Sequence, residues 1–235
     1  MIITGCNSRP GLMNIIDGEI TLLETGDTRG AAYVGDTLFY LTRKGLWRQR
    51  VAELAVLIYD VDLQWHGLHN TGHGLLAPDP VSDLIHEFDL KGNYVKPINW
   101  KNTETTLHTN DCWREGQDLW LTCFHLGVCK NGEPQGYGAG EQPHSPIRWQ
   151  LRTYYCSSNA GTVMCEKEMF CAPGGFTRGL LPTPAGLWVG SSKQRHEGKG
   201  GRAFVRLYSW GGDLLETIEL PTDEVYAIAI PGLGT

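Results

Sequence analysis

Short apolar-rich runs, bounded by glycine, proline and polar residues, recur along the whole chain. The clearest of them are rich in aromatic and β-branched residues and cover residues 36–42, 118–124, 152–156 and 186–190. Runs of this length and composition predict β-strands. No segment keeps a helical period over the roughly ten to twelve residues that a helix needs. The pattern therefore predicts a protein that is nearly all β.

A second pattern repeats at a longer interval, because a short segment that starts with arginine or histidine precedes each such strand. The segments start at Arg29, His66, His108, His144 and Arg178, with successive spacings of 37, 42, 36 and 34 residues. A repeat of about 40 residues that holds four strands is typical of one blade of a β-propeller. We therefore expect each segment to begin the innermost strand of a blade.

The two ends of the chain complement each other. Residues 224–230 predict another innermost strand with nothing after it to finish a blade. Residues 1–6, 12–16 and 19–24 predict three strands that no innermost strand precedes. Joining both ends in one blade predicts a six-bladed propeller that forms a single domain over residues 1–235. A five-bladed ring is the alternative, because the glycine-rich residues 126–143 are also typical of a loop in place of outer strands.

Composition narrows the classes of function. The net charge of −6 disfavours bulk attraction to nucleic acid or to an anionic membrane. No apolar run reaches the roughly 20 residues of a membrane helix, and the first residues lack the pattern of a signal peptide. The seven cysteines are odd in number and lack Cys-x-x-Cys spacing. We therefore expect reduced, mostly buried thiols and a cytoplasmic location.

Candidate chemistry follows from the propeller topology, which brings the starts of the innermost strands together at one mouth of the central channel. His66, His108 and His144 stand at equivalent places in three consecutive blades. Imidazoles arranged in this way predict a three-histidine site for a divalent transition metal such as zinc, iron or manganese. The alternative is a polar channel whose side chains bind strand ends and water.

Arginine and acidic residues at the same mouth predict an anionic ligand. Arg29 and Arg178 each precede a glycine, and guanidinium groups bind carboxylate or phosphate through two parallel hydrogen bonds. The alternative is that each arginine braces a strand or pairs with Glu224. Glu224 and Tyr226 are candidates for proton transfer. Candidate substrate-binding residues lie close to these positions in the sequence or on a polar loop: His69, Asn110, Asp111, Ser145 and Arg195.

Together these features predict a metal-dependent lyase or hydrolase that acts on a small polar substrate with an anionic group. The alternative is a non-enzymatic propeller that binds a peptide, glycan or protein partner at the same mouth. An iron- or copper-dependent oxidation at the same histidines is a third possibility that the residues do not separate from the first. We expect no nucleic-acid or membrane partner under any of these hypotheses.

Several of these segments resemble a bacterial family of uncharacterised β-propeller proteins. The most specific are Pro-His-Ser-Pro at 143–146 and Gly-Phe-Thr-Arg-Gly-Leu at 175–180, and the resemblance covers about residues 65–230. It implies the propeller fold and no established activity.

A looser likeness is to the peptide-amidating lyase, a six-bladed propeller that holds zinc with one histidine from each of three blades. That likeness implies the metal for His66, His108 and His144. It also implies roles on the substrate for Tyr226 and for one of the two arginines.

Overall fold

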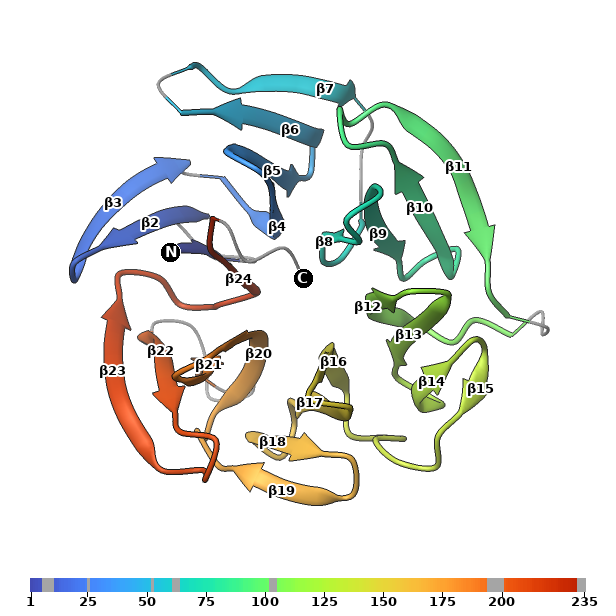
Figure 1. The fold of residues 1–235 in the computed structure, drawn as a ribbon, viewed down its shortest axis with the longest axis vertical. Coiled ribbons are helices and arrows are strands. Elements are labelled where there is room, and N and C mark those ends of the chain that lie inside the picture. The colour runs from blue at the N-terminus through green and yellow to red at the C-terminus, as the bar shows by residue number, and fades with distance from the viewer. Residues whose placement is uncertain are drawn as a thin grey trace.

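The computed structural model describes residues 1–5, 11–24, 26–51, 53–60, 64–101, 105–193 and 201–231. Within these residues, six four-stranded antiparallel sheets follow one another around a ring, and no helix is present (Figure 1). The fold is therefore a six-bladed β-propeller, as the sequence predicted, and the five-bladed alternative is wrong. The described residues hold no helix long and apolar enough to cross a membrane.

Each blade runs from the channel to the rim, and we number the blades from the first complete one. The strands of blades one to three are β4 (Thr28–Val34), β5 (Thr37–Thr42), β6 (Gly45–Arg50), β7 (Val56–Asp60); β8 (His69–Asn70), β9 (Leu75–Asp79), β10 (Leu84–Phe88), β11 (Tyr94–Asn99); and β12 (Thr109–Glu115), β13 (Asp118–Cys123), β14 (Gly127–Lys130), β15 (Glu133–Pro134). Those of blades four and five are β16 (Pro143–Trp149), β17 (Arg152–Ser157), β18 (Thr162–Cys165), β19 (Glu168–Cys171); and β20 (Phe176–Thr183), β21 (Gly186–Ser192), β22 (Ala203–Tyr208), β23 (Leu214–Leu220).

Blade six combines both ends of the chain, as predicted. It consists of β24 (Ala227–Ala229), β1 (Ile2–Thr4), β2 (Leu12–Ile16) and β3 (Glu19–Glu24), in that order from the channel outward. Ile3 of β1 pairs with Ile228 of β24 on one side and with Met13 of β2 on the other. The ring is thus closed by hydrogen bonds between distant segments rather than by a covalent link.

The core lies between the faces of neighbouring blades. Inner and second strands are buried on both faces, as in β5, where only the last residue is partly accessible. The outermost strands face solvent, and β11 and β23 are exposed over most of their length. Blade three differs from the others in its outermost strand, because β15 has only two residues, whereas β14 is as long as β18 of blade four. The glycine-rich residues 126–143 therefore form two short strands followed by a connecting segment. This outcome lies between the two predictions for these residues, a complete pair of outer strands and a loop in their place.

The cysteines follow the expectation of buried thiols. The six that the structure describes are free and buried, in the interiors of blades three and four. Cys6 lies outside the described residues.

Inner strands of four blades share an irregularity close to their first residues. The pairing with the second strand shifts register after Thr28 in β4, after Thr109 in β12, after His144 in β16 and after Arg178 in β20. A β-bulge of this kind bends the strand and redirects the side chains next to it. The side chains of the first residues of these strands therefore point in directions different from those of the later residues.

Candidate active site

Tyr226 is the centre of an aromatic cluster at the predicted mouth. Its ring lies 5.4 Å from that of His66 and 6.3 Å from that of His144, measured between centroids, and both contacts are edge-on. The Arg178 guanidinium lies 4.7 Å from the same ring. Tyr226 is held in place by blade six, because its main-chain N–H donates to the Thr4 carbonyl at 2.7 Å. The mouth therefore depends on closure of the ring.

Arg178 is a buried cation between two aromatic rings. Its guanidinium carbon lies 4.6 Å from the centroid of Phe176 and 4.7 Å from that of Tyr226, and the residue is only 4% exposed. Nη1 forms an ion pair with Glu224 Oε2 at 3.7 Å, which is too long for a hydrogen bond. Within the described residues, neither Nε nor Nη1 has a hydrogen-bond partner. Buried donors are normally paired, so these two nitrogens are exceptions among the described residues.

Arg29 has the opposite environment. The Asp27 carboxylate accepts hydrogen bonds from its Nε at 3.3 Å and from its Nη2 at 3.2 Å. A third donor, Nη1, lies 3.5 Å from the Gln64 carbonyl, in the segment that leads into blade two. Asp27 also accepts a bond from Arg43 at 3.0 Å. This is the bracing arrangement that the sequence left open as an alternative for the arginines.

His108 is held at the mouth by a buried carboxylate behind it. Asp83 accepts the N–H groups of Leu107 and Thr109, at 2.6 and 2.9 Å, and further bonds from the Thr109 hydroxyl at 3.0 Å and from Lys101 at 2.9 Å. Burial alone would raise the pKa of Asp83, but these donors outweigh it and the pKa is lowered. His108 itself has a positive φ of 56°. Although His108 is exposed, partial desolvation lowers its pKa, and the nearby charge of Arg178 acts in the same direction.

His144 is almost completely buried, at 3% exposed. Its Nδ1 lies 2.8 Å from the Gln142 carbonyl oxygen and 2.9 Å from Ser158 Oγ. Its ring packs against Phe176 at 5.9 Å, so it borders the aromatic residues that enclose Arg178.

Three predicted substrate-binding residues lie one layer inside the mouth and connect blades. Asn110 donates to the Pro143 carbonyl at 2.9 Å, and Ser145 Oγ accepts the N–H of Gly179 at 2.9 Å. Asp111 Oδ1 accepts the N–H of Cys112 at 2.9 Å. Burial raises the pKa of Asp111 to about 6, although hydrogen bonds from Cys112 and Ser145 and the charge of Arg178 oppose it. These contacts make the three residues braces behind the site.

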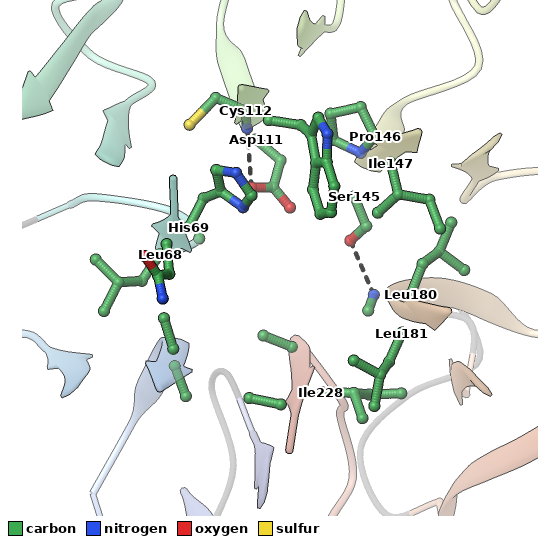
Figure 2. A pocket seen from close by; sticks show the side chains of 18 of the residues that line it. Leu68, His69, Asp111, Cys112, Ser145, Pro146, Ile147, Leu180, Leu181 and Ile228 are labelled. Atoms are coloured by element: carbon green, nitrogen blue, oxygen red, sulfur yellow. Dashed lines mark hydrogen bonds between the residues drawn. The ribbon is translucent and has the colours of Figure 1, made fainter. Parts of the chain in front are cut away.

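His69 lies further along the channel, in the cavity that Figure 2 shows. Its ring packs against that of Trp113 at an interplanar angle of 35°, with centroids 4.4 Å apart, and burial lowers the pKa of His69 to about 4. The volume open to the centres of water-sized molecules there is about 80 Å³. That volume holds a few waters, whereas small-molecule sites usually enclose about 300–1,000 Å³. A substrate is therefore expected at the mouth and not beside His69.

The three predicted metal ligands lie around the mouth but do not form the predicted site. The rings of His66 and His108 are 6.0 Å apart, whereas Tyr226 contacts both His66 and His144. Among the described residues, no three histidine, cysteine, aspartate or glutamate side chains are placed to hold one metal ion. The arrangement thus gives no fit for a three-histidine centre, and metal dependence stays a prediction.

Sequence reasoning missed the residues that support this site: Asp27, Asp83, Phe176 and Ser158. The sequence alone could have indicated Asp27 and Phe176. The segments Asp-Thr-Arg-Gly at 27–30 and Phe-Thr-Arg-Gly at 176–179 match except at their first residue. Asp83 and Ser158 come from turns and follow no pattern. Arg195, the remaining predicted substrate-binding residue, lies outside the described residues.

Comparisons with known proteins establish the fold and leave the family open. No protein-family model matches the chain, and no curated protein matches it either. A solved protein of unknown function from Bacteroides caccae is 12% identical with a TM-score of 0.71, and the match covers 97% of each chain. A chain of the nidogen/laminin complex is 10% identical with a TM-score of 0.68, covering 98% of this chain and 97% of that one.

Two further structural neighbours have described activities. Regucalcin from Agrobacterium tumefaciens, a calcium-binding protein, is 15% identical with a TM-score of 0.65, covering 87% of this chain and 78% of its own. Virginiamycin B lyase from Staphylococcus aureus is 12% identical with a TM-score of 0.57, covering 88% and 75%. At such identities the likeness shows the propeller fold alone.

Proposed function

We propose that this protein is a lyase or hydrolase that binds a small polar substrate at the channel mouth through an anionic group of that substrate. The observation that carries the proposal is Arg178. The residue is 4% exposed, and its Nε and Nη1 lack hydrogen-bond partners in the described chain. A carboxylate or phosphate would supply the missing acceptors in the plane of the guanidinium.

The energetics favour a ligand over a purely structural role. A buried charge is stabilised only when it is paired and hydrogen-bonded. Glu224 compensates the charge of Arg178 at 3.7 Å without a hydrogen bond from Nη1 or Nε. The stacked rings of Phe176 and Tyr226 hold the guanidinium in one orientation. Arg178 is therefore preorganised for an anion that arrives from the mouth.

Glu224 and Tyr226 are the candidates for contact with the reacting part of that substrate. Both are close to Arg178, one by its ion pair and the other by its ring. A substrate whose anionic group binds Arg178 therefore lies within reach of a carboxylate and a phenol. Such groups transfer protons in eliminations and hydrolyses and typically contribute about 10²- to 10⁴-fold to the rate. No step in this proposal passes through a metal, because the described residues do not form a site for one.

Binding and turnover are tested separately. Isothermal titration with malate, glutarate, benzoate and inorganic phosphate measures anion binding to the wild type and to Arg178→Gln. Arg43→Gln is the matched control, because Arg43 is exposed and pairs only with Asp27 among the contacts described. We expect binding of at least one probe that Arg178→Gln abolishes and Arg43→Gln retains. Equal binding to all three proteins would refute the proposed site.

Turnover is measured by mass spectrometry on a mixture of small carboxylic acids and phosphate esters incubated with the protein. In hydrolysis the product masses add up to substrate plus one water, and in a lyase reaction they add up to the substrate alone. We expect one of these outcomes for the wild type and its loss in Tyr226→Phe. Binding that depends on Arg178 without turnover would instead identify the alternative, a propeller that binds an anionic peptide, glycan or protein.

A further inference from the structure

A chain of hydrogen bonds behind His144 determines where its proton lies. Ser158 Oγ is 2.6 Å from the Thr177 carbonyl oxygen, which can only accept, so the hydroxyl proton of Ser158 points there. Ser158 Oγ is then an acceptor toward His144 Nδ1, 2.9 Å away. The Gln142 carbonyl, 2.8 Å from the same nitrogen, is also an acceptor. Both partners therefore require a proton on Nδ1.

A neutral imidazole carries only one N–H, so its lone pair is on Nε2. Competition from water is small, because Ser158 is fully buried and His144 is 3% exposed. The backbone supports the same orientation, since Gln142 and Ser145 on either side of His144 have positive φ values of 50° and 52°. A residue other than glycine adopts a positive φ at a cost in free energy, and residues held in this conformation are enriched at functional sites.

The imidazole so oriented belongs to the aromatic cluster around Arg178. His144 contacts the rings of Phe176 and Tyr226, the same two rings that enclose the Arg178 guanidinium. Bonds to Nδ1 hold the ring from behind, from the segment before β16 and from the turn after β17, and the start of β20 in turn holds Ser158. An anionic substrate held by Arg178 therefore lies beside an imidazole whose tautomer is already selected.

We infer that His144 is the proton acceptor of the reaction and that Ser158 is a positioning residue that fixes its tautomer. This inference rests on the proposed function. In an elimination, Nε2 takes a proton from a substrate C–H bond, the electron pair of that bond becomes the π bond to the neighbouring carbon, and the leaving group departs with the electron pair of its own broken bond. In a hydrolysis, Nε2 takes a proton from the attacking water, an electron pair of the water oxygen forms the bond to the substrate, and the leaving group again departs with the electron pair of its broken bond. Nε2 accepts the proton, Nδ1 keeps its own, and the leaving group takes the proton from Nε2 as the product forms.

Side-chain ¹⁵N NMR of histidine tests the tautomer without any substrate. We expect Nδ1 of His144 to be protonated and Nε2 to be the nitrogen that takes up a proton on acidification. In Ser158→Ala, Nδ1 loses one of its two acceptors, and we expect mixed tautomers. Ser157→Ala is the matched control, because Ser157 is equally buried and its hydroxyl makes none of the bonds to His144 described here. A wild-type His144 with its proton on Nε2 overturns the inference.

Turnover tests the catalytic role on the best substrate of the mixture described above. His144→Asn keeps a donor toward Ser158 and Gln142 but places no lone pair at the position of Nε2. We expect it to lose at least about 100-fold in kcat while Arg178-dependent anion binding changes by less than about threefold. We expect Ser158→Ala to lower kcat about tenfold with KM unchanged.

The outcomes separate the inference from the proposed function. Unchanged kcat in His144→Asn would refute the role of His144 and leave the lyase or hydrolase proposal standing. Anion binding without turnover by the wild type would refute the proposed function, and with it the proton-acceptor role, whatever the tautomer. Stoichiometric metal in the purified protein that is lost in His144→Asn would assign the Nε2 lone pair to a metal and overturn the inference.

Discussion

Two arginines occupy equivalent places in blades one and five and have opposite surroundings. Each follows a buried threonine and precedes a glycine beside a β-bulge, in Thr28-Arg29-Gly30 and Thr177-Arg178-Gly179. Arg29 donates two hydrogen bonds to Asp27. Arg178 is stacked between two rings, and its Nε and Nη1 lack hydrogen-bond partners in the described chain.

The residue two positions earlier makes the difference. Asp27 in blade one supplies a carboxylate that satisfies the guanidinium, whereas Phe176 in blade five supplies a ring that orients it. Glycine after each arginine lets the next blade approach, since a Cβ on Gly30 would lie 2.5 Å from the main chain of Gly67. The same backbone arrangement thus gives an arginine with a structural role or an arginine that we expect to bind a ligand. The side chain two positions earlier decides which. The predictions that follow test this contrast.

Replacing Arg178 should have the largest effect. Arg178→Gln removes the cation that we expect to bind the anionic group, and losing such a charge pair typically costs about 2–5 kcal/mol, or roughly 30- to 4,000-fold in affinity. Isothermal titration with the best probe anion measures the loss. Chemical denaturation of the same variant should show stability within about 1 kcal/mol of wild type. A large loss of stability with normal affinity would show that Arg178 is a second brace.

Replacing Phe176 by aspartate should give Arg178 the surroundings of Arg29. In Phe176→Asp a carboxylate stands where Asp27 stands in blade one, and it competes with an external anion for Arg178. We expect the affinity for the probe anion to fall about 10- to 100-fold. Phe176→Leu is the control, because it removes the ring without adding a charge and should weaken binding less than tenfold. Equal losses in both variants would show that stacking, and not pairing, controls Arg178.

Replacing Arg29 should affect stability and not binding. Arg29→Gln leaves Asp27 with Arg43 as a partner and removes the contact to Gln64, so we expect a loss of about 1–3 kcal/mol in the free energy of unfolding. Urea denaturation followed by tryptophan fluorescence measures it. The affinity for the probe anion should stay within about threefold of wild type. An affinity loss comparable to that of Arg178→Gln would place both arginines in the binding site.

The smallest expected effect is on two pKa values. Burial lowers the pKa of His108, and the charge of Arg178 adds to this; burial raises the pKa of Asp111, and Arg178 opposes it. Removing a cation destabilises a carboxylate and relieves an imidazolium, so Arg178→Gln should raise both pKa values. Arg29→Gln should change neither. NMR titration of the two side chains measures these pKa values. Equal shifts in both variants would mean that the charges of Arg29 and Arg178 affect His108 and Asp111 to the same extent.

The predictable part of the site followed from the repeat. Because equivalent positions in the blades of a ring lie on a circle around one axis, the recurrence of arginine and histidine at the starts of inner strands was enough to gather Arg178, Tyr226, His66 and His144 at one mouth. The layer behind the mouth was less predictable. Asn110, Asp111 and Ser145 are polar residues in the same segments, yet bulges turn them toward neighbouring blades.

By itself the sequence determined the propeller fold, the shared terminal blade and the set of residues around the mouth, because the order of strands in a propeller follows from the spacing of its repeats. It predicted six blades and left five as the alternative, which the structure excluded. Only the tertiary structure decided which partner each side chain has. Asp27 pairs with Arg29, Asp83 holds the segment before His108, and Ser158 orients His144. The physical reason is that hydrogen bonds need donors and acceptors within a few tenths of an ångström and a narrow range of angles. Bulges, turns and positive φ values set those positions, and the spacing of residue types along a chain does not record them.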